Sequence, residues 1–149
     1  MSLNLSKPLV YFDIEATGLN IASDRIVEVS FLRVEPDHTE NKRTWRVNPE
    51  ATISDEAFKV HGITHAEAET HPPFRDIARE VEQFIGHGDL AGFNLLRFDL
   101  PMQMEEFIRA DVDFDLTKRK VVDVQRIFHL MEKRTLEAAY RFYCNKSLE

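Results

Sequence analysis

The first third of the chain alternates apolar and polar positions in a way that predicts strands. An apolar run at residues 9–12 is followed by two acidic positions. Residues 26–34 would place Val27, Val29 and Phe31 on one face and Glu28 and Ser30 on the other. Residues 44–47 continue the pattern, so we expect a sheet that opens with antiparallel hairpins.

In the rest of the chain, the spacing of apolar residues changes to that of helices. Ser54 before two acids and Thr64 before Glu67 are typical helix starts. Apolar residues recur at helical spacing in residues 77–85, 100–108 and 136–143, and residues 120–124 indicate one more short strand. Together with a short apolar run that begins at Leu90, this order predicts one α/β domain, a five-stranded mixed sheet with helices on both faces.

Composition agrees with a single domain, because 149 residues with 43% hydrophobic content can form one core. The 26 acidic and 19 basic residues give a net charge of −7, which argues against a broad phosphate-binding surface but does not exclude nucleic acid. The one basic cluster, Lys118-Arg119-Lys120, is interpreted as a solvated loop, with backbone contact to nucleic acid as the alternative. The single cysteine, Cys144, is expected to be an inert buried thiol.

No apolar run approaches the roughly 20 residues of a membrane span, and no secretory signal is evident. We therefore expect no membrane partner and a cytoplasmic location.

Asp13 and Glu15 stand two residues apart where the first predicted strand runs into a glycine turn. In a strand, residues i and i+2 point to the same face. Two carboxylates on one partly buried face repel each other unless a cation lies between them, and oxygen ligands suit Mg²⁺ or Mn²⁺. Solvated acids at a strand end are the alternative.

A second acidic segment follows the next apolar run and ends in Asn94, Phe98 and Asp99, the last at an expected helix start. Taken alone, Asp99 would be interpreted as a helix N-cap. Together, however, the two segments resemble the first two motifs of the DnaQ-like (DEDD) 3′-to-5′ exonucleases, which include polymerase proofreading subunits. The matching positions are Asp13, Glu15, Thr17, Gly18, Leu19, Asn94, Phe98 and Asp99.

This resemblance implies a ribonuclease H-like fold and a metal-dependent 3′-to-5′ exonuclease. DNA is favoured over RNA as the expected substrate, although no residue indicates a contact to the 2′-hydroxyl. It implies two divalent cations, Mg²⁺ or Mn²⁺, held by Asp13, Glu15 and Asp99, which would also be the catalytic residues. It places Thr17, Gly18, Leu19, Asn94 and Phe98 at the substrate, with Leu19 wedged against the terminal base and Phe98 stacked on it or lining the pocket. The implied partners are a single-stranded 3′ end and, as a further candidate, a DNA polymerase subunit.

Two features depart from the family pattern. Four residues separate Asn94 from Asp99, where the proofreading-subunit branch has three, and the spacing is closer to that of B-type polymerases. The third motif, His or Tyr followed by Asp, is missing before Glu149. The expectation is an exonuclease domain over residues 1–149 that lacks its C-terminal catalytic helix and is poorly active.

The alternatives to an active nuclease are a non-enzymatic nucleic-acid-binding or protein-interaction module that kept the fold, and a more distant metal-dependent relative that shares only the fold. His61 lies in a segment that often borders the active site in the resembled family, and we expect a structural or substrate-binding role for it. Asp123, at the end of the last predicted strand, could face the metals, but it lacks the setting of the third motif.

Overall fold

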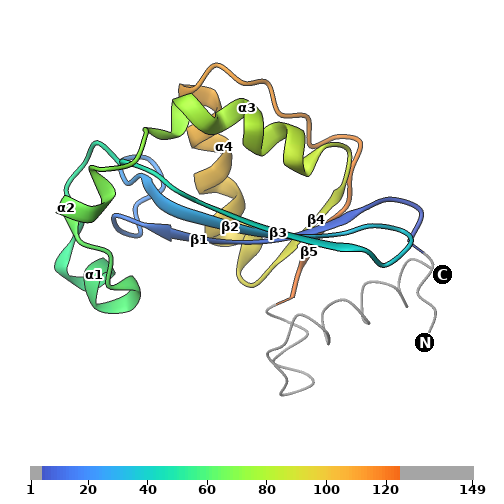
Figure 1. The fold of residues 1–149 in the computed structure, drawn as a ribbon, viewed down its shortest axis with the longest axis horizontal. Helices are drawn as coiled ribbons and strands as arrows, with labels where there is room; N and C mark the ends of the chain where they lie inside the picture. Colours follow the sequence, from blue (N-terminus) through green and yellow to red (C-terminus); the bar gives the residue numbers. More distant parts are fainter. Residues whose placement is uncertain (1–4, 125–149) are drawn as a thin grey trace.

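The computed structural model describes residues 5–124, which form one five-stranded sheet (Figure 1). The strands are β1 (Leu9–Ala16), β2 (Ile26–Val34), β3 (Glu40–Arg46), β4 (Asp89–Gly92) and β5 (Val121–Asp123). Their order across the sheet is β3-β2-β1-β4-β5. The first three strands are antiparallel neighbours, whereas β4 runs parallel to β1 and β5 parallel to β4. The predicted mixed sheet with opening hairpins is confirmed.

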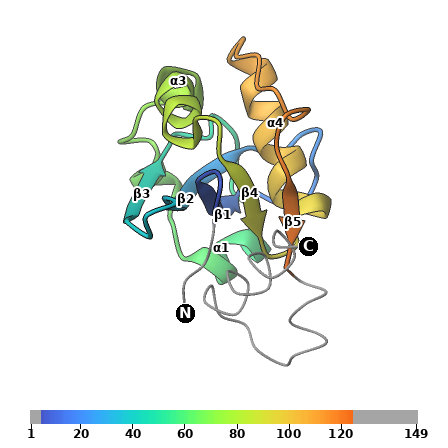
Figure 2. The same cartoon turned by 90° about the vertical axis from the view of Figure 1, so that its right-hand side faces the viewer.

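Helices lie on both sides of this sheet. The helices are α1 (Asp55–His61), α2 (His65–Ala68), α3 (Phe74–Ile85) and α4 (Leu100–Arg109), with a π-helical turn, η1 (Leu95–Asp99), leading directly into α4. Figures 1 and 2 show α3 and α4 together over one face and α1 on the opposite side. Ser54 and Thr64 cap α1 and α2 through their side-chain oxygens, as the sequence predicted.

The main core lies between the sheet and the pair α3 and α4. Val10, Phe12 and Ile14 of β1 belong to it, together with buried residues of α3 such as Phe74 and Val81. Because side chains alternate along a strand, Asp13 and Glu15 point to the opposite face. The same core therefore determines both the stability of β1 and the direction of its two carboxylates.

The sheet is incomplete beside the second half of β1. The parallel pairing with β4 ends at Tyr11 and Ala91, so residues 12–16 of β1 extend past the end of β4. The chain leaving β4 turns at this point through Asn94 into η1 and α4. Clefts beyond the carboxyl ends of parallel strands are common binding sites, and this edge brings the two acidic segments together.

Two sequence expectations need correction. Strand β3 begins at Glu40 rather than at residue 44, because its first five residues are exposed and polar and show no alternation. Ile108, assigned to the core face of α4, is exposed, and buried Gln103 and Glu106 share that face with Phe107 instead. The helix expected at residues 136–143 and Cys144 lie outside the described residues. Between residues 5 and 124, no helix is long and apolar enough to cross a membrane.

Candidate active site

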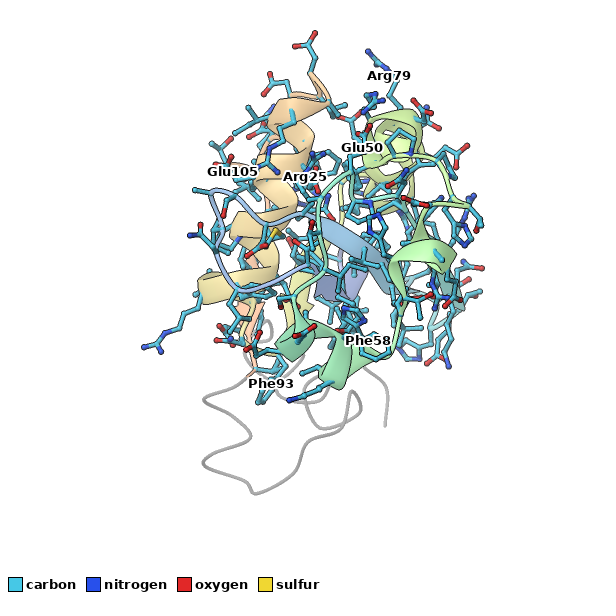
Figure 3. All side chains as sticks on the ribbon, turned by 90° about the vertical axis from the view of Figure 1, so that its left-hand side faces the viewer. Arg25, Glu50, Phe58, Arg79, Phe93 and Glu105 are labelled. Atoms are coloured by element: carbon cyan, nitrogen blue, oxygen red, sulfur yellow. The ribbon has the colours of Figure 1, made fainter. Side chains whose placement is uncertain are left out.

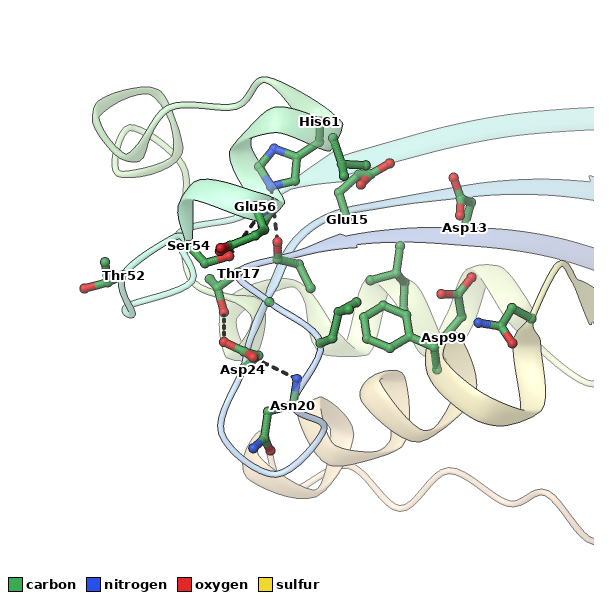
Figure 4. Close-up of a pocket in the computed structure, with 18 of the residues that line it drawn as sticks. Asp13, Glu15, Thr17, Asn20, Asp24, Thr52, Ser54, Glu56, His61 and Asp99 are labelled. Carbon is green, nitrogen blue, oxygen red and sulfur yellow. Dashed lines mark hydrogen bonds between the residues drawn. The ribbon is translucent and has the colours of Figure 1, made fainter.

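One pocket of about 710 Å³ lies at the end of β1, where β4 has stopped (Figure 4). Its walls come from the segment after β1, from α1 and from the turn between β4 and α4. All nine residues singled out in the sequence line it: Asp13, Glu15, Thr17, Gly18, Leu19, His61, Asn94, Phe98 and Asp99. The fold therefore brings two segments about 80 residues apart to one place.

The pKa values of all three predicted metal ligands are raised. Burial is the main cause that raises the pKa of Asp13 and of Glu15, and the charge of Glu28 adds to both. Asp99 is buried, and burial followed by the charges of Asp13 and Glu15 raises its pKa to about 8. Asp13 is exposed and Glu15 half-buried, so the cost falls mainly on the charge of buried Asp99, which is unfavourable unless the group binds a proton or a cation.

Asp99 is not a helix cap in this structure. Its backbone is helical, and its side chain makes no capping hydrogen bond to α4. The N-cap interpretation of this carboxylate therefore fails, and its position in the pocket beside the two carboxylates of β1 is the better explanation for an acid at this point.

The donor set suits a hard divalent cation. Asp13, Glu15 and Asp99 offer only oxygen atoms, and no Lys or Arg is among the described residues that line the pocket. The carboxylates are not a preformed cage, since within residues 5–124 no group of three or more His, Cys, Asp or Glu side chains is arranged to hold a metal. Mg²⁺ commonly retains several water ligands and needs only one or two carboxylates, so the residues present fit such an ion.

The segment after β1 is shaped by Asp24, which the sequence did not single out. Its carboxylate accepts hydrogen bonds from the hydroxyl of Thr17 (2.8 Å) and the backbone N–H of Asn20 (2.8 Å). Thr17 in turn accepts one from the N–H of Arg25 (3.0 Å). A Cβ on residue 18 would lie 2.5 Å from Oδ2 of Asp24, so only glycine fits beside this carboxylate.

Apolar side chains form the rim of the pocket. Leu19 is 84% exposed and Val60 79% exposed, although both are large hydrophobic residues. Phe93 and Phe98 complete the apolar part of the lining. Figure 3 shows Phe93 and Phe58 on the side of the sheet away from Arg79 of α3. Exposed apolar groups beside a polar pocket are typical of binding surfaces and can stack on nucleobases.

His61 lies in the pocket wall with both ring nitrogens engaged. Its Nδ1 accepts the backbone N–H of Ile63 (3.0 Å), and Nε2 lies 3.1 Å from the carbonyl oxygen of Ala16. This pattern requires the neutral tautomer with the proton on Nε2. His61 therefore ties the end of α1 to the end of β1, which agrees with a structural role and leaves no free nitrogen to act as a base.

Asn94 begins the second acidic segment in a left-handed backbone conformation (φ 57°, ψ 32°). The backbone N–H of Asn94 and that of Leu96 each donate a 3.1 Å hydrogen bond to the carboxylate of Asp123 on β5. Asp123 is not among the residues that line the pocket. Its charge nevertheless contributes to the raised pKa of Asp99. A place for the Asp123 carboxylate near the metal ions therefore stays a prediction, and the contacts that the structure shows for it are those to this turn.

An ion pair between half-buried Arg25 and buried Glu106 joins the start of β2 to α4. The carboxylate of Glu106 on α4 accepts hydrogen bonds from the guanidinium of Arg25 (2.9–3.1 Å) and from the N–H of Ile26 (2.8 Å). Figure 3 shows Arg25 beside α4. No sequence pattern pointed to this pair, since its members are 81 residues apart.

The basic cluster at residues 118–120 is not part of the pocket. Arg119 stacks over the ring of Phe114 (4.3 Å) and donates hydrogen bonds to the carbonyl oxygens of Asp115 and Gly88. These contacts hold the loop before β5 in place, so the role of Arg119 is structural.

Comparison with known proteins agrees with this geometry. A family model described as RNase_T, exonuclease, matches residues 10–146, which is nearly the whole chain. The chain belongs to this family of DnaQ-like exonucleases. It is 25% identical to a DNA polymerase III subunit epsilon of Buchnera aphidicola over 97% of this chain and 60% of that protein. It is 25% identical to a PolC-type DNA polymerase III of Oceanobacillus iheyensis over 76% of this chain and 8% of that protein. The chain thus spans less than two thirds of these relatives.

Solved structures show the same fold. Escherichia coli exonuclease I in complex with a dT13 oligonucleotide superposes with a TM-score of 0.75 at 17% identity, over 85% of this chain and 30% of that one. The zinc-bound form of its complex with single-stranded DNA gives a TM-score of 0.76 at 17% identity, over 85% of this chain and 30% of that one. The predicted ribonuclease H-like fold is confirmed.

Proposed function

We propose that this protein is a metal-dependent 3′-to-5′ exonuclease that hydrolyses phosphodiester bonds at the end of a single strand, with DNA as its preferred substrate. The observation that carries the proposal is the meeting of Asp13, Glu15 and Asp99 in one pocket whose described lining has no Lys or Arg. A polyanionic substrate can approach such a pocket only if cations offset its charge. The single-stranded DNA held by the exonuclease I neighbours supports the substrate class.

In the proposed mechanism Asp13, Glu15 and Asp99 hold two Mg²⁺ or Mn²⁺ ions. Such ions would provide activation of the attacking water and stabilisation of the leaving 3′ oxygen. The residues of this chain position the end nucleotide. Exposed Leu19 would contact the terminal base, and Phe98 would stack on it or line its pocket. The backbone at Gly18 together with Asn94 would position the end nucleotide. Thr17 is buried and its N–H and carbonyl are bonded to Arg25 and Ser54, so its part is to hold this segment in place.

The rival function is a binding module without activity. It shares the fold and the apolar rim, but it gives no reason for three mutually repelling carboxylates in one pocket. One relative named as a subunit of DNA polymerase III and another named as a PolC-type DNA polymerase III support a polymerase as a partner in the proposal.

A strand labelled at its 5′ end tests the function. The full-length protein with Mg²⁺ or Mn²⁺ is expected to shorten a single strand one nucleotide at a time from the 3′ end and to stop when a chelator is added. Asp13→Ala should abolish shortening while leaving the fold intact. Asp37→Ala, which removes an exposed carboxylate in the hairpin between β2 and β3, is the matched control and should retain activity. A full-length protein that binds the strand but never shortens it would overturn the proposal in favour of the binding module.

A further inference from the structure

The carboxylate of Asp123, which lies on β5, caps the start of η1 in place of the residue that precedes this helical turn. The first N–H groups of a helix have no partner within the helix, and the side chain before it usually accepts one of them. Here Asn94 stands at that position, yet its side chain makes no capping bond. Asp123 accepts the N–H groups of Asn94 and Leu96 instead, each at 3.1 Å, from 29 and 27 residues away.

This arrangement leaves the Asn94 side chain available to the pocket, whose wall it forms. An Asn at a helix start would ordinarily turn its oxygen back on its own backbone, which would remove that oxygen from the site. The carboxylate also offsets the partial positive charge at the start of the helix that runs through η1 into α4.

Asp123 also determines where η1 begins. It is paired in register with Gly92 at the parallel edge of β4 and β5, and the next N–H, that of Val124, donates to the carbonyl of Gly92 (2.9 Å). The sheet therefore fixes the position of the Asp123 carboxylate, which accepts two hydrogen bonds from the turn after β4. Asp99 is the last residue of η1, so the rotation of this π-helical turn decides which way the Asp99 carboxylate points.

We propose that Asp123 is a positioning residue, which caps the turn from Asn94 to Leu96 so that Asp99 and the Asn94 side chain face the pocket. This proposal rests on the proposed function for its consequences, because the groups it positions are those assigned to metal and substrate. Residues that orient metal ligands typically contribute 10- to 100-fold in metal affinity or activity.

The test is Mn²⁺ affinity, followed by electron paramagnetic resonance of free Mn²⁺, in the full-length protein and three variants. Asp123→Asn loses one of two acceptor oxygens, and Asp123→Glu keeps the charge but shifts the carboxylate. Val121→Ala weakens the packing of the same half-buried strand without touching the two hydrogen bonds. We expect both Asp123 variants to bind Mn²⁺ at least tenfold more weakly than the parent, and Val121→Ala to bind it normally.

Three results would overturn the inference. Normal Mn²⁺ affinity in Asp123→Asn would show that the cap is unnecessary. Normal affinity in Asp123→Glu alone would show that only charge counts, and an equal loss in Val121→Ala would show a general structural role. In the activity assay, positioning predicts a fall in kcat for Asp123→Asn together with a rise in the KM for the oligonucleotide, because Asn94 is assigned to the substrate.

An independent readout separates this inference from the proposed function. Amide protons bonded to a carboxylate resonate downfield, so Asp123→Asn should shift the Asn94 and Leu96 signals upfield and move those of η1 through Asp99. Unmoved signals would overturn the inference. Absence of Mn²⁺ binding in the parent protein, by contrast, would count against the nuclease while the nuclear magnetic resonance result still decides the role of Asp123.

Discussion

The charge state of Asp99 makes the stability of the metal-free protein depend on pH. Its pKa is raised from 3.8 to about 8 by burial and by Asp13 and Glu15, whereas in the unfolded chain it should titrate near its ordinary value. Between these two pH values the folded state binds the proton and the unfolded state does not. The free energy of unfolding must therefore fall as pH rises through this interval, by at most about 1.4 kcal/mol per pH unit.

We expect Asp99→Asn to remove most of that slope and to be more stable than the parent protein at pH 8. Urea unfolding in the presence of a chelator, measured from pH 5 to pH 9, checks this. Saturating Mn²⁺ should raise the free energy of unfolding of the parent protein at pH 8 by more than that of the variant. Parallel pH profiles for the two proteins would contradict the assignment of Asp99 as the buried, coupled carboxylate.

Gly18 has a steric reason to be glycine. A Cβ there would lie 2.5 Å from Oδ2 and 2.8 Å from Cγ of Asp24, whose carboxylate is held by Thr17 and Asn20. Gly18→Ala should therefore destabilise the protein by about 1–3 kcal/mol, which is typical of forced overpacking. Thermal unfolding measures it. In an Asp24→Ala background the same substitution should have a much smaller effect, and an undiminished effect would mean that the clash is not with Asp24.

Single residues were predictable where their chemistry is local. Asp13 and Glu15 share a face because strands alternate, and Ser54 and Thr64 cap helices that begin beside them. Asp24 was missed because its role depends on a loop that returns to Thr17, which no periodic pattern records. Asp123 was noticed as an acid at a strand end, but the direction of its carboxylate could not be known without the register of β4 and β5.

At the scale of elements, the pair Arg25 and Glu106 holds α4 against the start of β2. Glu106 is 1% exposed and carries three hydrogen bonds from Arg25 and one from the backbone of Ile26. Removing one partner of a buried pair usually costs about 3–5 kcal/mol. Arg25 is half-buried, and Arg109 also lies 3.7 Å from the Glu106 carboxylate, so part of the charge of Glu106 stays compensated. We therefore expect Arg25→Ala to destabilise the protein by an amount at the lower end of this range, about 3 kcal/mol.

Chemical denaturation measures that loss, and Arg75→Ala is its control because Arg75 pairs with Glu50 on the exposed surface. The control should leave the midpoint unchanged, since exposed pairs contribute little. If Arg25→Ala proved as stable as Arg75→Ala, α4 would be held by its apolar face alone.

Element types were easier to predict than element bounds. Strand β2 runs over the predicted residues 26–34 because its apolar face is buried and its other face is polar. Strand β3 lies at the edge of the sheet, where charged residues are favoured, so the pattern failed for its first half. The π-helical turn η1 was not predicted at all, because the register of a single helical turn depends on the contacts at both ends.

For the whole molecule, the decisive feature is the distribution of charge. The chain carries a net charge of −7, and its described site offers carboxylates and apolar side chains to the substrate. The contacts of Arg119, Arg25 and Arg33 are internal, to backbone carbonyls, rings or neighbouring carboxylates. At the described pocket, whose lining has no Lys or Arg, attraction to a phosphate group would therefore have to come from bound cations.

This leads to a prediction about binding that is separate from cleavage. A short fluorescent single strand should bind the full-length protein only when a divalent cation is present. Ca²⁺, which also prefers oxygen ligands, should support binding at Asp13, Glu15 and Asp99, and Asp13→Asn should weaken it. Fluorescence anisotropy with Ca²⁺ and with chelator provides the measurement.

The salt dependence of binding gives a second check. The logarithm of the affinity for a single strand falls with the logarithm of the salt concentration, at a slope of about −0.7 per neutralised phosphate. Two phosphates held at the site therefore imply a slope no steeper than about −1.5. Tight binding in chelator with a much steeper salt dependence would instead indicate a basic surface elsewhere on the protein, and the carboxylate pocket would no longer be the place where the strand is held.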